Sequence, residues 1–450
     1  MPSALKSSVA PLYLLACLFL GGSAQGIWQN AALQILGVAI IGWSLSERLE
    51  EPMVPATKAL LLLGLAAVVI VAIQAVPLPP AIWAHGARAQ IANGYALLGK
   101  PVPALPISVT PYGSLNSFLG IIPPVAIFVA IVRLNAYRPS WIAAAVLAGA
   151  VGGIMLGALQ VASPVPIWYL YRETNIGFGV GFFANANHMA TLLLIALPFV
   201  AAIGAAGKSR NVQRYSALLT ILAGIALLLL VGIALNGSLA GFALAVPVIA
   251  ASGLIVLPTT SVNRTLLAAI AAVSMLASVG ILASSSIGGT KFGQAVSSSV
   301  ESRQQILATT AKAINDYMPF GSGLGSFKRV YRLHESPDAV GAEYVIHAHN
   351  DYAEIALELG LPGVALILLF IAWWTVAVRA VWLGGEGGPF TRAASIASAA
   401  ILVHSLVDFP LRTAAISTCF AMCLALLADR RVPRQQDATD LRPSRHLVIG

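Results

Sequence analysis

Long apolar stretches recur along most of the chain, and they limit what it can fold into. A helix of about 20 apolar residues crosses a hydrocarbon core roughly 30 Å thick. In lipid, backbone N–H and C=O groups must pair within the membrane, and a helix pairs nearly all of its own. We therefore expect an all-α integral membrane protein with about twelve transmembrane helices. The expected spans are residues 9–25, 29–46, 57–76, 115–133, 140–160, 188–207, 215–235, 239–257, 265–283, 352–378, 393–409 and 412–428.

The composition agrees with a membrane protein and argues against two other classes. Only 10% of the 450 residues are charged, against about 25% in soluble domains. The net charge of +9 comes mainly from short basic loops and the C-terminus, so it indicates membrane topology and no nucleic-acid partner. The cysteines Cys17, Cys419 and Cys423 lie in apolar stretches, which argues against disulfides and against a thiolate zinc site.

The basic residues also predict an orientation. Most Lys and Arg residues in short loops fall on the side of the N-terminus, which predicts that both termini are cytoplasmic. Three longer segments, about 77–114, 161–187 and 284–351, then face the outside.

We divide the chain into three parts. Residues 1–160 hold the first five expected helices, and residues 161–428 form a core that includes the longest outer loop. The polar tail at 429–450 is expected to be a disordered cytoplasmic segment.

The longest outer loop is too long to be structureless in a compact protein unless it is functional. Its segment "SRQQILATTAKAINDYM" has apolar residues at Leu307, Ala311, Ile314 and Met318. This spacing predicts an amphipathic helix. The helix should end at Pro319, which is followed by the turn-rich "FGSGLGSF".

Ionisable side chains form a stripe where this loop enters the next span. His347, Asp351, Glu354 and Glu358 have the spacing of one helix face. Ionisable groups within a membrane segment are costly to bury and are functional candidates by default. The alternative is that Asp351 and Glu354 only stabilise the start of the helix, where carboxylates suit the dipole.

His349 is the candidate general base, because the pKa of imidazole lies near neutrality. It could instead be a structural hydrogen-bonding group. His347 and His349 could also share a metal ion, but no third ligand has a typical spacing and no D-x-D pair is present. We therefore expect neither a metal nor a cofactor.

Three outer arginines, Arg172, Arg303 and Arg412, would suit a diphosphate, since guanidinium forks bind phosphate oxygens bidentately. Two simpler roles remain open. Arg412 could pair with Asp408 across a short turn, and Arg303 could be a solvated charge beside Glu301.

Four motifs in this order resemble the O-antigen ligase and polymerase superfamily of bacterial envelope glycosyltransferases, over about residues 165–428. They are "GFFANANHMATLL" with Asn185, Asn187 and His188, the Arg303 helix with Gly321, Gly323, Gly325 and Phe327, "HAHNDYAEIALELG" with His349, Asn350 and Gly360, and "HSLVDFPLR". One position departs from the pattern. Many relatives have Ser-Arg where this chain has Ser238-Leu239.

The resemblance implies a periplasmic-face transferase of cell-envelope or lipopolysaccharide biosynthesis. The donor would be a glycan on undecaprenyl diphosphate in the lipid bilayer. The diphosphate of this donor would lie against Arg303, Arg172 and Arg412. His349 would act as the base, with Asn350 or Asp351 orienting it, in a metal-independent inverting displacement. His347, Glu354, Asn185, Asn187 and His188 would support the site.

Several acceptors fit these motifs. The acceptor hydroxyl could belong to lipid A–core, to a growing polysaccharide such as O-antigen or exopolysaccharide, or to a protein, as in an oligosaccharyltransferase. A different class, a transporter or flippase of lipid-linked glycans, also fits about twelve spans. Transporters, however, place polar residues near the bilayer midplane, whereas here they gather at one face.

Overall fold

The computed structural model describes residues 3–24, 27–48, 52–134, 138–257, 262–283, 291–337, 340 and 344–429. In these ranges the protein is helical, and the strand-type pairing is an isolated bridge between Leu78 and Leu105. The N-terminal helices are α1 (Ser3–Leu20), α2 (Trp28–Ser46), α3 (Pro55–Ala75), α4 (Pro80–Trp83), η1 (Gly86–Arg88), α5 (Ala89–Leu97), α6 (Pro111–Leu119), α7 (Ile122–Leu134) and α8 (Pro139–Ala162). The remaining helices are η2 (Pro166–Trp168), α9 (Ala186–Ala206), α10 (Val212–Asn236), α11 (Leu239–Val256), α12 (Val262–Ala283), α13 (Lys291–Tyr317), α14 (Phe327–His334), α15 (Asp351–Trp382), α16 (Pro389–His404), η4 (Pro410–Arg412) and α17 (Ala414–Ala428).

Seven helical segments in the described part are long and apolar enough to cross a membrane, which makes the chain a multi-pass membrane protein. They are α3, the pair α6–α7, α8, α9, α10, α11 and α15. Every expected span overlaps a helix. The count of twelve spans and the cytoplasmic placement of both termini stay predictions. The tail from residue 430 onward lies outside the described residues.

Two expected spans differ from the helices in the structure. The expected helix at 393–409 ends at His404, so Asp408 lies in a turn between α16 and α17. The expected helix at 115–133 is broken between α6 and α7. Pro123 lies in the first turn of α7, where the missing N–H of proline costs no internal hydrogen bond.

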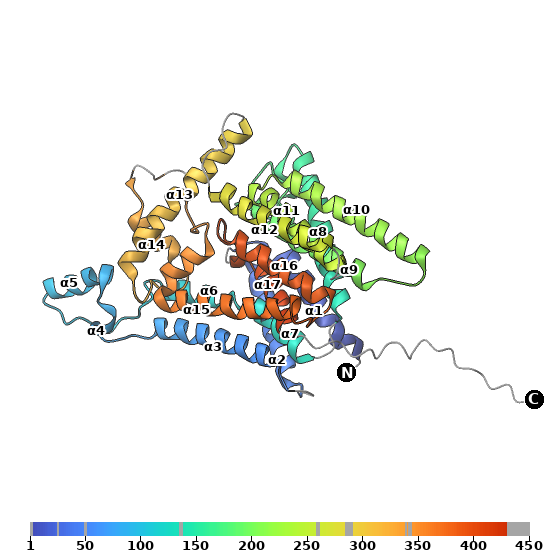
Figure 1. Ribbon diagram of the computed structural model, residues 1–450. Helices are drawn as coiled ribbons and strands as arrows, with labels where there is room; N and C mark the ends of the chain where they lie inside the picture. The colour runs from blue at the N-terminus through green and yellow to red at the C-terminus, as the bar shows by residue number, and fades with distance from the viewer. Residues whose placement is uncertain are drawn as a thin grey trace, which may run out of the picture.

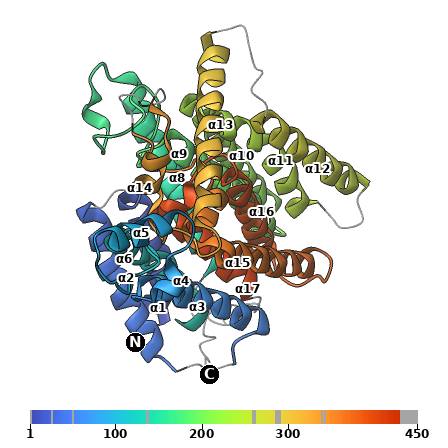
Figure 2. The same cartoon turned by 90° about the vertical axis from the view of Figure 1, so that its left-hand side faces the viewer.

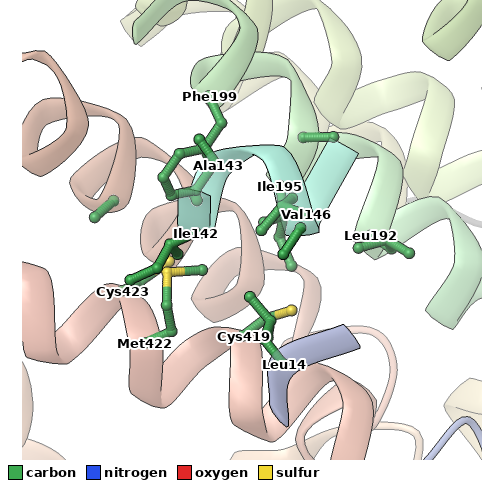
Figure 3. Packing of buried hydrophobic residues seen from close by; sticks show 14 of the residues in the cluster. Leu14, Ile142, Ala143, Val146, Leu192, Ile195, Phe199, Cys419, Met422 and Cys423 are labelled. Carbon is green, nitrogen blue, oxygen red and sulfur yellow. The ribbon is translucent and has the colours of Figure 1, made fainter. Parts of the chain in front are cut away.

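The apolar core lies among α1, α8, α9 and α17. Leu14, Val146, Ile195 and Cys419, one from each of these helices, are fully buried and converge in Figure 3. Helix α9 is central, with 78% of its span buried, whereas the corresponding share in α3 is 11%. The mostly uncovered apolar surface of α3 therefore suits a lipid-facing position.

The loop segments gather at one end of the molecule. Figure 1 shows α4, α5, α13 and α14 at the left end, while the N-terminus lies toward the right. Helices α3 and α15 run side by side toward that end. Figure 2 looks onto it, with α13 crossing the view vertically.

Helix α13 confirms the helix expected in the longest loop, but its buried stripe is shifted by one residue. The buried positions are Ile306, Thr310, Ala313 and Tyr317, and Leu307 is exposed. Thr310 fits this apolar face because its hydroxyl donates to the Ile306 carbonyl oxygen at 2.7 Å. A stripe of apolar letters alone does not reveal such a self-satisfied threonine.

Candidate active site at the start of helix α15

The glycine-rich turn after α13 docks against α15 through backbone contacts. Helix α15 is kinked at Gly360, whose φ of 64° is costly for any residue with a Cβ. The kink exposes backbone groups that the turn satisfies. Gly323 N donates to Glu358 O at 2.8 Å, and Leu361 N donates to Pro319 O at 2.8 Å. The arginine-bearing helix and the histidine-bearing segment are thereby held in one fixed arrangement.

His349 lies just before α15, and its imidazole faces Asp408. Its Nδ1 is 3.3 Å from Asp408 Oδ1, and the Asp408 side chain is fully buried. The imidazole is 28% exposed, so Nε2 is the nitrogen that can meet a substrate. His349 also has a φ of 50°, a conformation that is uncommon outside glycine and often marks functional positions.

The carboxylate that lies against the His349 imidazole is that of Asp408. We expected Asn350 or Asp351 to orient His349, and in the structure both of these residues have other partners. Asn350 is the N-cap of α15, since its Oδ1 accepts from Ala353 N at 2.9 Å, and its Nδ2 donates to Leu406 O at 2.9 Å. Asn350 thus attaches the turn that carries Asp408 to the start of α15.

The charge of Asp408 is stabilised by its surroundings. Burial alone would raise the pKa of this carboxyl group, but contact with His349 and the positive charge of Arg303 hold the pKa well below its usual value. A carboxylate that stays ionised can stabilise an imidazolium on His349.

Three imidazoles surround the ring of Phe409. The ring centroid of Phe409 lies 4.2 Å from that of His347, 5.0 Å from that of His349 and 5.0 Å from that of His188. His188 is buried at the start of α9, and neither of its ring nitrogens has a hydrogen-bond partner among the described residues. The expected grouping of these histidines is therefore present, with Phe409 at its centre.

Arg412 contacts three carboxylates of α15. Its guanidinium lies 3.6 Å from Asp351 Oδ1, 3.4 Å from Glu354 Oε1 and 3.1 Å from Glu358 Oε2. The pairing with Asp408 that we considered for Arg412 is thus replaced by pairing across to α15. Burial opposes the charge on Arg412, but the carboxylates raise the pKa of its guanidinium above the ordinary value.

The carboxylates do more than stabilise the start of α15. Glu354 accepts from His347 Nδ1 and from Ala348 N, both at 2.9 Å. Asp351 accepts from Ser405 Oγ at 2.9 Å. The expected stripe on one face is confirmed, although His347 precedes the helix, which begins at Asp351.

The asparagines before α9 have structural hydrogen bonds. Asn185 is the N-cap of α9 and accepts from Asn187 N at 2.8 Å. Asn187 Oδ1 accepts from Ser238 Oγ at 2.7 Å. Ser238 is itself the N-cap of α11, so the starts of α9 and α11 are joined at this point. Leu239, where many relatives have arginine, is the first residue of α11.

The remaining two arginines differ in position. Arg303 of α13 is half-buried, and its charge contributes to the lowered pKa of Asp408. Arg172 lies on the exposed surface of the segment between η2 and α9. The structure therefore relates Arg303 to the His349–Asp408 pair, while a role for Arg172 stays a prediction.

Two residues that sequence reasoning missed also hold the site. Gln74 at the end of α3 donates to Glu358 O at 2.9 Å, and its Oε1 accepts from Leu324 N at 3.3 Å. Arg88 donates to Gly321 O and stacks 5.0 Å from the ring centroid of Tyr317. A glutamine near the end of an apolar span and a loop arginine give little indication of such distant partners.

Comparison with known proteins is consistent with this geometry. Residues 224–368 match the family model described as O-antigen ligase. This range includes Arg303, the glycine-rich turn and His349, whereas Asp408 and Arg412 lie beyond it. A comparison with curated proteins found no match. The match covers about a third of the chain, and over those residues it supports the resemblance to the O-antigen ligase and polymerase superfamily.

Proposed function

We propose that the protein is a membrane glycosyltransferase that moves a glycan from undecaprenyl diphosphate to an acceptor hydroxyl in surface-polysaccharide ligation or polymerisation. The reaction takes place on the periplasmic face of the bacterial inner membrane. The observation that carries the proposal is the His349–Asp408 pair, with 3.3 Å between Nδ1 and Oδ1. His349 lies within the residues that match the O-antigen ligase family model.

In the proposed reaction, His349 Nε2 accepts the proton of the attacking hydroxyl. The hydroxyl oxygen bonds to the anomeric carbon as the bond from that carbon to the diphosphate oxygen breaks. Undecaprenyl diphosphate leaves with the electron pair, and the anomeric configuration is inverted. Asp408 stabilises the imidazolium that forms, as the buried carboxylate does in a Ser-His-Asp triad.

The leaving diphosphate needs neutralisation, which fixed cations provide. Arg303 is the first candidate because its charge acts on the same buried carboxylate as His349 does. Arg172 is the second. We give Arg412 a positioning role, since three carboxylates already surround its guanidinium.

The test is turnover by the purified full-length protein. Given an undecaprenyl-diphosphate glycan and an acceptor glycan, it should release undecaprenyl diphosphate, with EDTA present and only when the acceptor is supplied. Release that does not depend on the acceptor would contradict transfer. Movement of intact lipid-linked glycan across vesicles without cleavage would instead indicate a flippase.

A further inference from the structure

A second basic site lies on helix α14, away from His349. A cavity of about 540 Å³ is lined by Lys328, Arg329 and Arg332 on one side and by Tyr112 and Gly113 of α6 on the other. This volume is within the range of small-molecule sites. Figure 2, which looks onto the end of the molecule where the loop segments gather, shows the labels of α6 and α14 on its left side.

Lys328, Arg329 and Arg332 all lie on helix α14, which is packed against the rest of the protein. The opposite face of α14, formed by Phe327, Val330 and Tyr331, is buried in a small apolar core. Lys328 and Arg332 are four residues apart, so they occupy one stripe of the exposed face. Like charges at this spacing repel, and an anion placed between them relieves the repulsion.

The floor of the cavity is a close backbone contact between α6 and the glycine-rich turn. A Cβ on Gly113 would lie 3.0 Å from Gly325 O. Ser114 Oγ donates to Leu324 O at 2.7 Å, and Val109 N donates to Ser322 O at 2.9 Å. These contacts bind the α6 wall of the cavity to the turn that leads into α14, so the cavity is built into the fold.

The lining selects for a particular chemistry. None of Lys328, Arg329 and Arg332 has an ion-pair partner among the described residues. Guanidinium forks bind carboxylate or phosphate oxygens bidentately. Tyr112 is 87% exposed, and its ring offers a flat apolar face to the C–H side of a sugar ring.

We propose that this basic pocket binds an acidic sugar, bearing a carboxylate or phosphate group, of the glycan on which the protein acts. Phe327 N donates to Glu358 Oε1 at 3.3 Å on the inner side of α14, so the carboxylate–Arg412 cluster and the pocket lie on opposite sides of this helix. The pocket therefore holds a part of the glycan remote from the reacting carbon. This inference rests on the proposed function.

Binding to purified full-length protein in detergent tests the proposal, with trigalacturonate as the acidic probe and maltotriose as its neutral counterpart. Wild-type protein should bind trigalacturonate at least about tenfold more tightly than maltotriose, with an affinity that falls as salt rises. The triple variant Lys328→Gln, Arg329→Gln, Arg332→Gln should lose this preference. Lys312→Gln, at an exposed cation of α13 outside the pocket, should keep it.

Equal affinity of the wild type for the two sugars would overturn the proposal. So would a triple variant that binds trigalacturonate as tightly as the wild type does at an unchanged melting temperature. Binding of phosphatidylglycerol is measured as well, and a triple variant that loses only this binding would overturn the proposal and indicate a lipid headgroup site. His349→Ala should bind trigalacturonate as the wild type does. If trigalacturonate binding depends on the three cations but no glycan transfer occurs, only the proposed function fails; if transfer occurs without such binding, only this inference fails.

Discussion

Gly321 and Gly360 lie backbone against backbone, although 38 residues lie between them in the chain. A Cβ added to either would lie 2.5 Å from the backbone nitrogen of the other, and both have positive φ angles, 75° and 64°. This contact joins the turn after the Arg303 helix to the kink of the helix that His349 precedes.

Gly321→Ala should therefore destabilise the protein and reduce transfer. A Cβ at this φ is strained, at a cost of about 1–3 kcal/mol, and it would also force the two backbones apart. The melting temperature in detergent measures the effect. Gly64→Ala is the matched control, because a Cβ there meets nothing within 4 Å; equal melting temperatures for both variants would contradict the packing role of Gly321.

Asp408→Asn should reduce transfer about 10²-fold or more, because the imidazolium of His349 loses its stabilising charge. Initial rates with saturating donor and acceptor measure this loss. The KM for the donor should change little, because the Asp408 carboxylate contacts His349 and is not one of the groups proposed to bind the donor diphosphate. A variant with a wild-type rate would exclude Asp408 as the orienting residue.

The same variant has a predictable pH dependence of stability. The pKa of Asp408 is lowered in the folded protein, so its stabilising effect is present above the unfolded-state pKa of about 3.9. The effect is lost as pH falls through the lower, folded-state pKa. Asp408→Asn should thus melt below the wild type at pH 7, and the gap should narrow below about pH 4. A constant gap between the two melting temperatures would contradict the lowered pKa of Asp408.

Removing Arg412 should be severely destabilising. Arg412→Met would leave Asp351, Glu354 and Glu358 buried without a counterion, and breaking a buried pair costs about 3–5 kcal/mol. Protein yield and melting temperature measure the effect. Arg210→Met, at an exposed position, is the control. Adding Glu354→Gln and Glu358→Gln to Arg412→Met should restore part of the melting temperature if charge imbalance is the cause.

Arg303→Lys should weaken donor use while the protein stays folded. A lysine ammonium keeps the charge but cannot bind two phosphate oxygens with a planar fork. We expect the KM for the lipid-linked donor to rise and the rate to fall, with an unchanged melting temperature. Kinetics equal to those of the wild type would remove Arg303 from the proposed diphosphate site.

Much of the fold followed from apolar stretches, because helix formation in lipid depends on properties local to each stretch. The carboxylate stripe of α15 could also be predicted, since helical spacing alone places Asp351, Glu354 and Glu358 on one face. Arg303 and His349 were singled out by side-chain chemistry and by their position in an outer segment, and the family motifs then pointed to the same residues.

The pairings across the site could not be predicted in the same way. Asp408 and Arg412 are four residues apart, which suggested one local pair. Instead, Asp408 contacts His349 just before α15, and Arg412 contacts three carboxylates of α15. Their partners are set by the end of α16 at His404 and by the turn that follows it. Such choices depend on how helices meet in space, and the sequence has no local signal for them.

The most direct test of the central claim is transfer by His349→Ala in the purified, folded protein. The measurement is acceptor-dependent release of undecaprenyl diphosphate, with melting temperature as the check on folding. We predict that release falls to background while the melting temperature stays near that of the wild type. Release at the wild-type rate would show that His349 is not the base, and the proposed mechanism would be wrong.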